Sequence, residues 1–461
     1  MTNQSLKKSS SPEAIWPGLE AGVPKPLMPY SPAIKAGGWV FIAGQLASDM
    51  KTGLAPEIRR ENRFLKGQLS LESDYVLGNL ADTIKATGCD INTDMVRIWQ
   101  YFANNSPSIG DFERGNNWPN LSINPYLQSR QQFVTQCPPS SSVGCSELMW
   151  RDTQLEVDMI CFDDEHETQF FGVPSGMTLP PGAHAPALRR GDWVFLSAES
   201  ALEWDGKNSG SARMGGPNGP SAGAISESTM WFDSTVAQQT GRTLEKLALI
   251  AEAAGSCLEN AVKAEVYIGH PRDFAAMDEV WKHWFPNNPP ARVVVPYMGL
   301  GVRGSRVEIA LTLLANDATL TKQTIETADA PEQPGHEPQA VKVGNFLFFS
   351  TQMAFDSSGV LAEGMVRHPN APWYGSPGQN QMRYMMKNVS SICEAAETKV
   401  ENIVRRVCFH NDLQWFSDSI QEWASYFPGD RPVSTTIGIA GGPMVVEGAN
   451  TLLDLIAYVP D

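Results

Sequence analysis

The segment Ala33-Ile-Lys-Ala-Gly-Gly-Trp-Val-Phe-Ile-Ala-Gly-Gln45 occurs three times in the chain with small changes. It returns as Ala187-Leu-Arg-Arg-Gly-Asp-Trp-Val-Phe-Leu-Ser-Ala-Glu199 and as Ala340-Val-Lys-Val-Gly-Asn-Phe-Leu-Phe-Phe-Ser-Thr-Gln352. The aromatic anchors Trp39, Trp193 and Phe346 are 154 and then 153 residues apart. Each copy is a glycine-containing turn followed by an apolar strand. Self-similarity at a fixed period predicts three copies of one structural unit.

A helical pattern follows each copy of the segment. Leu77, Leu80, Ala81 and Ile84 have the spacing i, i+3, i+4, i+7 of an amphipathic helix. Gly88 stands where a helix end favours a left-handed residue. The pattern recurs from Leu244 to Gly255 and, in the third copy, from Met386 to Glu397, where a glutamate replaces the glycine.

Each unit continues in the same order. A strand is expected from Val96, Val262 and Val404, and a second amphipathic helix at 274–284 and at 416–427. In the first copy this second helical region, 104–136, is expanded and less regular. Closing strands are expected at 154–160, 306–311 and 451–457.

One unit is therefore an α+β sandwich of about 140 residues, with two helices on one face of a mixed sheet. The other sheet face also needs burial, and three sheets packed around a shared centre would provide it. We expect an intramolecular pseudo-trimer with the sheets inside and the helices outside. The expected divisions are a flexible arm (1–22), repeat 1 (23–163), a linker (164–173), repeat 2 (174–316), a linker (317–334) and repeat 3 (335–461).

Composition limits the possible partners. The 461 residues are 42% hydrophobic and carry a formal charge of −16, which disfavours nucleic acid and anionic membranes. No apolar run reaches the roughly 18 residues of a membrane span, and the first residues lack a secretion signal. Seven cysteines without a Cys-x-x-Cys pair are typical of a reduced, cytoplasmic protein. Because the seven histidines form no cluster, we expect no metal site.

The stretch from Pro289 to Leu314 holds the main candidate site. It has two strand-like runs joined by a connection that contains Gly299, Gly301 and Gly304. A hairpin of these runs would bring Arg292 and Glu308 together. A guanidinium matches a carboxylate, and a nearby glutamate can move protons. The alternative is an ordinary ion pair between neighbouring strands.

These features resemble the Rid family (reactive intermediate deaminases, also called the YjgF family) in three tandem copies over nearly the whole chain. The family's Gly-Pro-Tyr-Ser-Gln-Ala and Ser-Gly-Gln segments are similar to Met28-Pro-Tyr-Ser-Pro-Ala33 and Ala43-Gly44-Gln45. Its Pro-Ala-Arg and Glu-Ile-Glu-Ala segments are similar to Pro290-Ala291-Arg292 and Val307-Glu308-Ile309-Ala310. The resemblance implies a chorismate-mutase-like fold and a homotrimer fused into one polypeptide, with ligand clefts between the units.

The resemblance also implies an activity. Family members with the arginine hydrolyse imino or enamino acids to a carbonyl compound and ammonia without a cofactor. Arg292 would then hold the substrate carboxylate, and Glu308 would order water and move protons. An imine is already electrophilic, so positioning and one acid–base group can suffice.

Several positions depart from the family pattern. The arginine position falls on Ser141 or a neighbour in the first copy and on Ser434 in the third. The closing-strand glutamate is Glu156 in the first copy and is matched to Asp454 in the third. The tyrosine position holds Tyr30, His184 and Glu337, and the Ser-Gly-Gln segment gains Glu199 in the second copy. We therefore expect three clefts that are no longer alike.

Each remaining candidate has two interpretations. His184 is a general base near neutral pH or a surface hydrogen-bonding residue. Tyr30 donates a hydrogen bond to a ligand or only packs. Ser141 binds substrate or is a nucleophile, although the sequence places no activating base beside it. Glu199 binds substrate or is a solvated strand-edge carboxylate.

The expected function is a cofactor-independent hydrolase, not a peptidase, that acts on a C–N bond of a small, anionic substrate. Imine or enamine deamination is the first expectation. The alternatives are hydrolysis of an amide or ring C–N bond in a catabolic pathway, and a non-catalytic binder of small molecules. Further self-association of the fused trimer is possible, and an RNA substrate is disfavoured by the negative charge.

Overall fold

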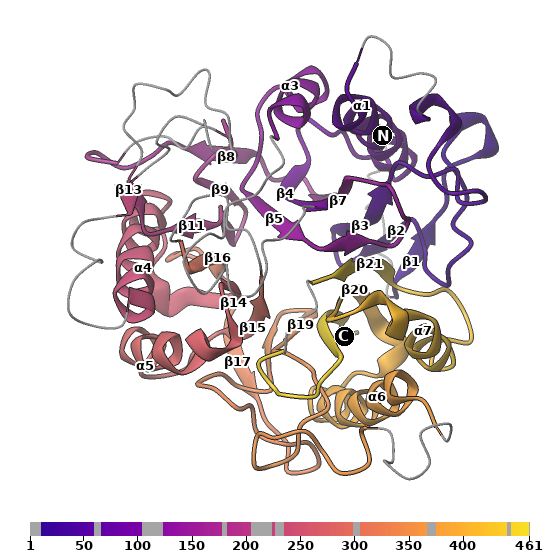
Figure 1. The fold of residues 1–461 in the computed structure, drawn as a ribbon. Helices are drawn as coiled ribbons and strands as arrows, with labels where there is room; N and C mark the ends of the chain where they lie inside the picture. Colours follow the sequence, from indigo (N-terminus) through magenta and orange to yellow (C-terminus); the bar gives the residue numbers. More distant parts are fainter. Residues whose placement is uncertain are drawn as a thin grey trace, which may run out of the picture.

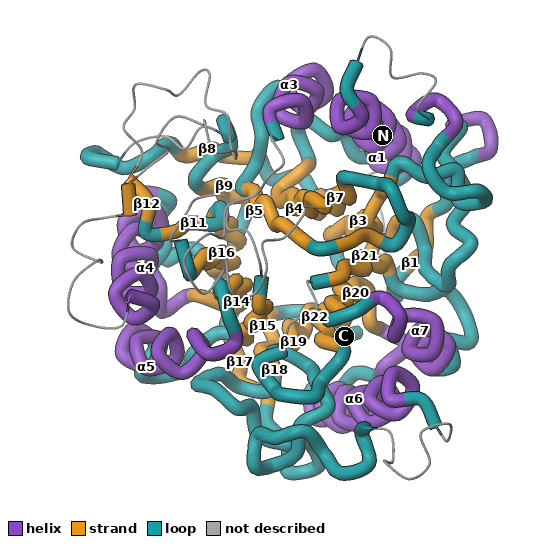
Figure 2. The backbone as a smooth tube through the Cα atoms, in the orientation of Figure 1, coloured by secondary structure: helices purple, strands orange, loops and turns teal. Residues whose placement is uncertain are grey.

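The structure is a computed structural model that describes residues 11–59, 66–103, 123–177, 182–203, 224–225, 235–297, 305–366, 375–439 and 444–460. Figure 1 shows three lobes around a common centre, each formed by one third of the sequence. Figure 2 shows the strands gathered toward this centre and the helices at the periphery. The expected α+β architecture of three repeated units, with sheets inside and helices outside, is confirmed.

Repeat 1 contains a sheet of order β1-β2-β3-β7-β4-β5. Its strands β4 and β5 are parallel, so the chain must cross over between them, and α3 lies in this crossover. The elements are β1 (Glu13–Ile15), β2 (Ala33–Ala36), β3 (Trp39–Leu46), α1 (Gln68–Ala86), β4 (Met95–Ala103), α3 (Asn124–Phe133), β5 (Ser140–Cys145), β6 (Glu147–Leu148) and β7 (Leu155–Phe162).

Repeat 2 contains a sheet of order β15-β14-β16-β10-β9-β8, with the short β11 also paired to β16. The small β12–β13 ribbon stands apart from it. The elements are β8 (Thr168–Phe171), β9 (Ala187–Arg190), β10 (Trp193–Leu196), β11 (Glu199–Ser200), β12 (Leu202–Glu203), β13 (Ala224–Ile225), α4 (Thr235–Ala253), β14 (Ala261–Ile268), α5 (Phe274–Trp284), β15 (Ala291–Pro296) and β16 (Val307–Leu314).

Repeat 3 contains a sheet of order β17-β18-β19-β22-β20-β21-β6. Its last strand, β6, belongs to repeat 1 in sequence, so one repeat extends the sheet of another. The remaining elements are β17 (Lys322–Ile325), β18 (Ala340–Val343), β19 (Phe346–Phe349), α6 (Pro377–Ala395), β20 (Ile403–His410), α7 (Phe416–Ala424), β21 (Val433–Gly438) and β22 (Thr451–Tyr458).

The ends of the long helices behave as their sequences predict. Gly88 and Gly255 follow α1 and α4 with φ angles of 88° and 75°. In repeat 3 the equivalent Glu397 adopts the same left-handed conformation, with φ 63°. The backbone geometry is thus retained although the glycine that favours it is lost.

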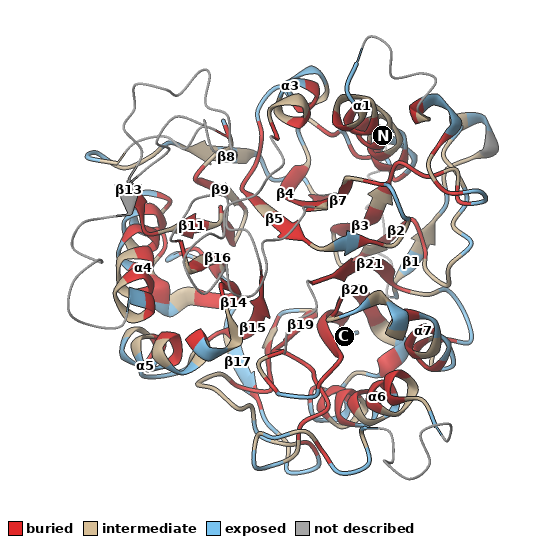
Figure 3. Cartoon of the chain, viewed as in Figure 1, coloured by how far each residue is buried: buried red, intermediate tan, exposed pale blue. Residues whose placement is uncertain are grey.

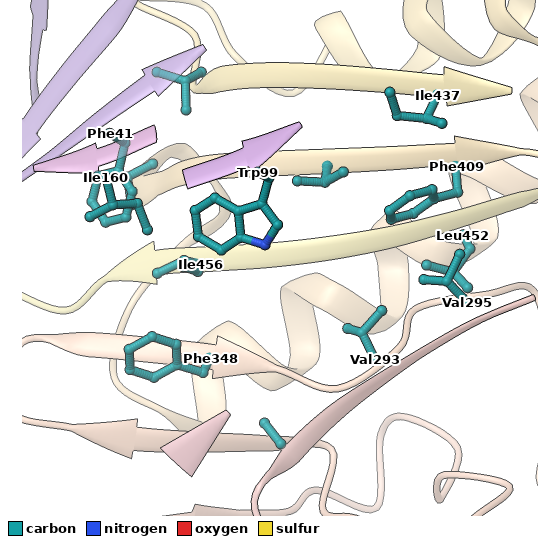
Figure 4. Close-up of a cluster of buried hydrophobic side chains, with 14 of the residues drawn as sticks. Phe41, Trp99, Ile160, Val293, Val295, Phe348, Phe409, Ile437, Leu452 and Ile456 are labelled. Carbon is teal, nitrogen blue, oxygen red and sulfur yellow. The ribbon is translucent and has the colours of Figure 1, made fainter. Parts of the chain in front are cut away.

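The centre of the molecule is an apolar core shared by all three sheets. Trp39 contacts Trp193 and Phe346, with ring centroids 4.9 and 4.8 Å apart, so the three sequence anchors meet there. Three further apolar clusters lie beneath the helices of the separate repeats. Figure 3 shows buried residues concentrated on the strands and on the inward sides of the helices. Figure 4 shows side chains from all three repeats in the central cluster: Phe41, Trp99, Ile160, Val293, Val295, Phe348, Phe409, Ile437, Leu452 and Ile456.

A cycle of buried ion pairs links the repeats near this core. Each pair joins a cation of one repeat to a carboxylate of the next, and each cation follows the same register shift in its strand. The pairs are Arg97 with Glu265 at 3.2 Å, Lys263 with Asp454 at 2.7 Å, and Arg405 with Asp158 at 3.2 Å. The three positive charges are balanced by three negative ones, so the charges are compensated despite their burial.

Three expected boundaries need correction. Part of the segment expected to be a flexible arm, Glu13–Ile15, is β1 and pairs with β2. Thr168–Phe171 and Lys322–Ile325, placed in linkers, are β8 and β17, and they extend the sheets of repeats 2 and 3. Pairing with a sheet edge satisfies backbone groups that a free linker would leave to water. The connection with Gly299, Gly301 and Gly304, and residues 104–122 of the expanded region, lie outside the described residues.

Removing one member of the ion-pair cycle is expected to destabilise the whole chain. Lys263→Met should lower the free energy of unfolding by about 3–5 kcal/mol, because it leaves the Asp454 carboxylate without its closest partner in a buried site. Denaturant unfolding measures the effect. The control is Lys342→Met, which removes a pair with the exposed Glu397 and should change stability by within about 0.5 kcal/mol. Equal effects of the two substitutions would contradict the structural role of the cycle.

Candidate functional site

The candidate residues lie in three seams, one between each pair of repeats. Each seam is named by the two repeats that form it: 1/2, 2/3 and 3/1. In the 2/3 seam, the backbone nitrogen of Arg292 in β15 donates to the Ser350 hydroxyl, and the Arg292 carbonyl accepts from the Thr351 backbone nitrogen, at 3.0 Å each. In the 1/2 seam, Ser140 of β5 makes the same two bonds to Ser197 and Ala198. In the 3/1 seam, β21 lies against β3, and the backbone nitrogen of Ser31 donates to the carbonyl of Pro432 at 3.3 Å.

The expected hairpin that joins Arg292 to Glu308 is wrong. Strand β14 lies between β15 and β16, pairing parallel with the first and antiparallel with the second. Arg292 is opposite Ala264 on one side of β14, and Glu308 is opposite Tyr267 on the other. The two side chains therefore belong to different seams. Strand β14, which begins at Ala261, lies between β15 and β16 in the sheet. Because β15 and β16 follow each other in the sequence, the sequence gives no sign of this intervening strand.

In the 2/3 seam, Arg292 is fully buried and its guanidinium is occupied. It lies over the ring of Trp281 at 4.8 Å and donates to Asp278 at 2.5 Å and to Glu337 of repeat 3. Glu337 stands at the family's tyrosine position, so the chain itself supplies a carboxylate to this arginine. The closing strand of repeat 3 carries Leu452 at the place of Glu308, so this seam has no acid–base carboxylate there.

The 1/2 seam places Glu308 near Glu199. Burial raises the pKa of Glu308 to about 8, and the neighbouring Glu199 adds to the rise. Glu199 is not a solvated strand-edge group, because Lys246 of α4 pairs with it at 2.5 Å and both side chains are buried. The role of Glu199 in substrate binding therefore stays a prediction, but its carboxylate already has a structural partner.

His184 lies at the edge of the same seam, bridged to Cys137 of repeat 1. Among the described residues its Nε2 atom has no hydrogen-bond partner. Burial lowers the pKa of His184 to about 3, and the positive charges of Arg130 and Arg97 lower it further. The imidazole is thus neutral at physiological pH and a weak proton acceptor, which is unfavourable for a general base.

The serine that replaces the family's arginine in repeat 1 is Ser140, not Ser141. Ser140 makes the backbone bonds that Arg292 makes in the 2/3 seam, whereas Ser141 lies one residue further and faces the central core. Ser141 is fully buried, and Arg97 donates to its hydroxyl at 2.5 Å. Because successive strand residues face opposite sides, this one-residue shift removes Ser141 from the ligand side of the seam. Asp454 likewise matches Asp158 and not Glu156, whose counterpart is Leu452.

The 3/1 seam contains a pocket of about 450 Å³, its open mouth included. Its walls are mainly apolar, with the polar groups of Tyr30, Glu156, Ser434 and Thr436 among them. This combination of apolar walls and a few convergent polar groups is typical of small-molecule sites. The remaining lining residues are Met28, Gly44, Leu46, Met50, Met149, Trp150, Phe416 and Ile420.

Glu156 is the acid–base candidate of this pocket. It is 2% exposed, and among the described residues its Oε2 atom has no hydrogen-bond partner. Burial raises the pKa of this carboxyl well above its usual range, and the charge of Asp158 adds to the rise, so the protonated form is favoured. Gly44 permits this placement, because a Cβ atom there would collide with the Glu156 carboxyl group.

A guanidinium stands behind the pocket wall although the family's arginine is absent from β21. Arg406 of β20 is opposite Ser434 and donates to its hydroxyl at 2.7 Å. It is fully buried and stacks over Trp423 at 5.0 Å. In the described part of the chain its Nε and one terminal nitrogen have no partner. Because the Ser434 oxygen accepts from Arg406, the serine hydrogen is free to point into the pocket.

Sequence reasoning missed Arg406, Asp278 and the pairing of Glu337 with Arg292. One sequence feature could have pointed to Arg406, namely the tryptophan on the second helix of its repeat. Arg406 stacks on Trp423 as Arg292 stacks on Trp281.

Within the described ranges, no group of three or more metal-binding side chains is found, and no helix is long and apolar enough to cross a bilayer. The seven cysteines are unpaired.

The chain resembles known proteins in three separate stretches. A family model described as endoribonuclease L-PSP matches residues 21–162, 220–314 and 327–447. A RutC family protein of Pyrococcus horikoshii is 26% identical over 140 residues, 30% of this chain and 98% of that protein. The mitochondrial protein mmf2 of Schizosaccharomyces pombe is 34% identical over 130 residues, 28% of this chain and 84% of its own length.

Among solved structures, RidA from an Antarctic Psychrobacter is 28% identical and covers 30% of this chain and 99% of its own, with a TM-score of 0.25. The two sequence relatives match over 140 and 130 residues, about the length of one repeat. The three matches of the family model support the division into three copies.

A double-mutant cycle tests the separation of Arg292 and Glu308. The destabilisation by Arg292→Lys and by Glu308→Gln should add within about 0.5 kcal/mol, because β14 lies between the strands that carry them. The positive control is Arg292→Lys with Glu337→Gln, whose members are in contact and should couple by about 0.5–3 kcal/mol. Urea unfolding of the variants gives the values. A coupling energy above about 1 kcal/mol for Arg292 with Glu308 would contradict the topology.

Proposed function

The chain belongs to the Rid family as three fused copies, and from this premise we propose that it hydrolyses a C–N bond of a small imine or enamine in the pocket of the 3/1 seam. Membership of the family supports a role in small-molecule deamination or a related reaction. The observation that supports this reaction is the buried Glu156 carboxyl: burial raises its pKa, and among the described residues one of its oxygens has no hydrogen-bond partner in the pocket that Tyr30 and Ser434 also line.

The proposed reaction converts an imine and water into a carbonyl compound and ammonia. Glu156 gives its proton to the imine nitrogen and becomes a carboxylate. Water adds to the carbon, and the carboxylate takes the proton that this water loses. That proton then passes to the nitrogen of the carbinolamine, which leaves as ammonia. The Glu156 carboxylate takes the hydroxyl proton as the C=O bond forms, and this restores the protonated carboxyl that began the cycle.

The other polar groups of the pocket position the substrate. The Ser434 hydroxyl, polarised by the Arg406 guanidinium, donates toward the pocket and favours an oxygen with negative charge. Burial raises the pKa of the Tyr30 phenol, so it remains a neutral hydrogen-bond donor. The charged group that contacts Ser434 is the Arg406 guanidinium, which is a cation. An anionic substrate is therefore favoured although the whole chain carries −16.

The alternative of a serine nucleophile has less support. Ser141 is fully buried beside Arg97, and the Ser434 hydroxyl accepts from a guanidinium, which gives neither serine a base. Non-catalytic binding is favoured by one observation, the occupied Arg292 of the 2/3 seam. That observation concerns a different seam from the pocket. The net charge also argues against an RNA substrate, because RNA binding needs a basic surface.

Glu156→Gln tests the proposed acid–base group. The variant should lose about 10²–10⁴-fold in ammonia release from an imine generated in situ by an amino-acid oxidase. Its stability should change little, because glutamine has nearly the shape of the neutral, protonated glutamate. Arg292→Lys is the control and should retain most of the activity. Loss of activity in Arg292→Lys with full activity in Glu156→Gln would move the chemistry to the 2/3 seam.

The pH dependence supplies an independent check. Since the acid form of Glu156 acts first, activity should fall as pH rises through its raised pKa. The free energy of unfolding should also fall with rising pH, because the folded state holds the Glu156 proton more tightly than the unfolded chain. This decrease should run from the ordinary carboxyl pKa toward the raised one. Glu156→Gln should show a smaller decrease than the parent chain in pH-dependent urea unfolding. Identical slopes would contradict a protonated Glu156.

A further inference from the structure

The proposed reaction leaves most of the 3/1 pocket without a role. It uses the polar groups, whereas most of the lining side chains are apolar. Repeat 1 contributes Met50, Met149 and Trp150 to this apolar wall, and repeat 3 contributes Phe416 and Ile420. A small polar ligand would leave water against these side chains, whereas a large apolar group would displace it.

Strand β6 brings Met149 and Trp150 to the pocket. It pairs antiparallel with β21 of repeat 3, and both residues follow it directly in the sequence. The backbone nitrogen and the hydroxyl of Ser146 donate to the carbonyl of Gly438 at 2.9 and 2.8 Å. A Cβ atom at Gly438 would collide with the Glu147 side chain, so the glycine at this position admits β6. The apolar wall is therefore part of the interface between the two repeats.

The turn after β6 fixes Trp150 in place. The carbonyl of Trp150 accepts from the backbone nitrogen and the hydroxyl of Thr153 at 3.2 and 2.6 Å. The carboxylate of Glu72 in α1 accepts from the backbone nitrogens of Gln154 and Leu155 at 2.7 and 3.2 Å. The half-buried indole packs against the central core. Because these contacts already hold the turn, ligand binding costs little conformational freedom at Trp150.

Met50 is held at the pocket by a strained turn. Its backbone adopts a left-handed conformation with φ 55°, and the residue is only 4% exposed. The Ser48 hydroxyl accepts from the Met50 backbone nitrogen at 2.9 Å. The Asp49 carboxylate accepts from the backbone nitrogens of Lys51 and Thr52 at 2.9 and 2.7 Å. These hydrogen bonds offset the cost of a conformation that methionine rarely adopts, and backbone strain of this kind clusters at functional sites.

We propose that the 3/1 pocket selects substrates with a large apolar side chain, above all an aromatic one, and that Trp150 determines this preference. The inference rests on the proposed hydrolysis and names the class of imine that the pocket accepts. Glu156 and Ser434 act on the C–N bond and the charged end of the substrate, and the apolar wall receives its side chain. An aromatic ring placed there is removed from water and contacts the Trp150 indole.

Titration calorimetry of the full chain with three 2-oxo acids tests the preference. Pyruvate, 4-methyl-2-oxopentanoate and phenylpyruvate share the carboxylate and the carbonyl group, so the contribution of these groups cancels in the ratio of their affinities. Phenylpyruvate should bind at least about 50-fold more tightly than pyruvate, with the branched acid between them. Trp150→Ala should lower this ratio by at least about tenfold, and Trp150→Phe should keep most of it.

Trp284→Ala is the matched control. Trp284 is also half-buried, packs against the core beneath the helices of repeat 2 and does not line the pocket, so its removal should leave the ratio at the parental value. If Trp150→Ala fails to fold, Met149→Ala removes another half-buried side chain of the same wall and should lower the ratio in the same direction. Equal affinities for the three acids, or a ratio that the alanine variant of the wall leaves unchanged, would overturn the proposal.

Ammonia release separates this proposal from the reaction itself. The imines of phenylalanine and alanine, generated by an amino-acid oxidase, should show the same preference in kcat/KM. If the ratio of affinities is as expected but neither imine is hydrolysed faster than in buffer, the side-chain preference stands and the hydrolysis fails. If both imines are hydrolysed with equal kcat/KM and the affinities are equal, the hydrolysis stands and the preference fails.

Discussion

Helices cover only one face of each sheet, and the opposite face is apolar, so no repeat can bury its own surface. Closing three sheets around one centre removes these faces from water together, and the contact of Trp39 with Trp193 and Phe346 marks the place where they meet. The buried ion pairs of Arg97, Lys263 and Arg405 each link one repeat to the next, which directs the packing around a full cycle. The three seams follow from this closure, because a ring of three sheets has three interfaces between neighbouring sheets.

Each seam contains residues from two repeats. One repeat supplies the tyrosine position and the closing-strand glutamate, and the other supplies the arginine position. In a homotrimer, one substitution alters all three seams at once. In a single chain the seams can change independently, and here the arginine and the glutamate no longer share a seam. Arg292 is paired with Glu337 in the 2/3 seam, whereas Glu156 and Glu308 lie in the 3/1 and 1/2 seams. The 3/1 pocket combines a buried carboxyl of raised pKa with a serine whose hydroxyl accepts from Arg406.

The sequence predicts the fold well because its signals are local and occur three times. The strand segments, the helix ends at Gly88 and Gly255 and the central anchors all depend on short-range patterns. The site is predicted less well because its geometry depends on strand order and register. Arg292 and Glu308 are close in sequence but separated by β14, and a one-residue difference between Ser140 and Ser141 changes the face of the sheet. Glu337 acts through a partner in another repeat, and Arg406 acts through Ser434 on the neighbouring strand of its own repeat. The sequence shows neither contact.

We propose that the reactive seam is the one between repeats 1 and 3 and not the one that contains Arg292. A crystal structure of the full chain soaked with a small 2-oxo acid, the product class of the proposed reaction, tests it most directly. Electron density for the acid is expected against Glu156, Tyr30 and Ser434, with the pair of Arg292 and Glu337 intact. Density on Arg292 with Glu337 displaced, and an empty pocket between repeats 1 and 3, would contradict it.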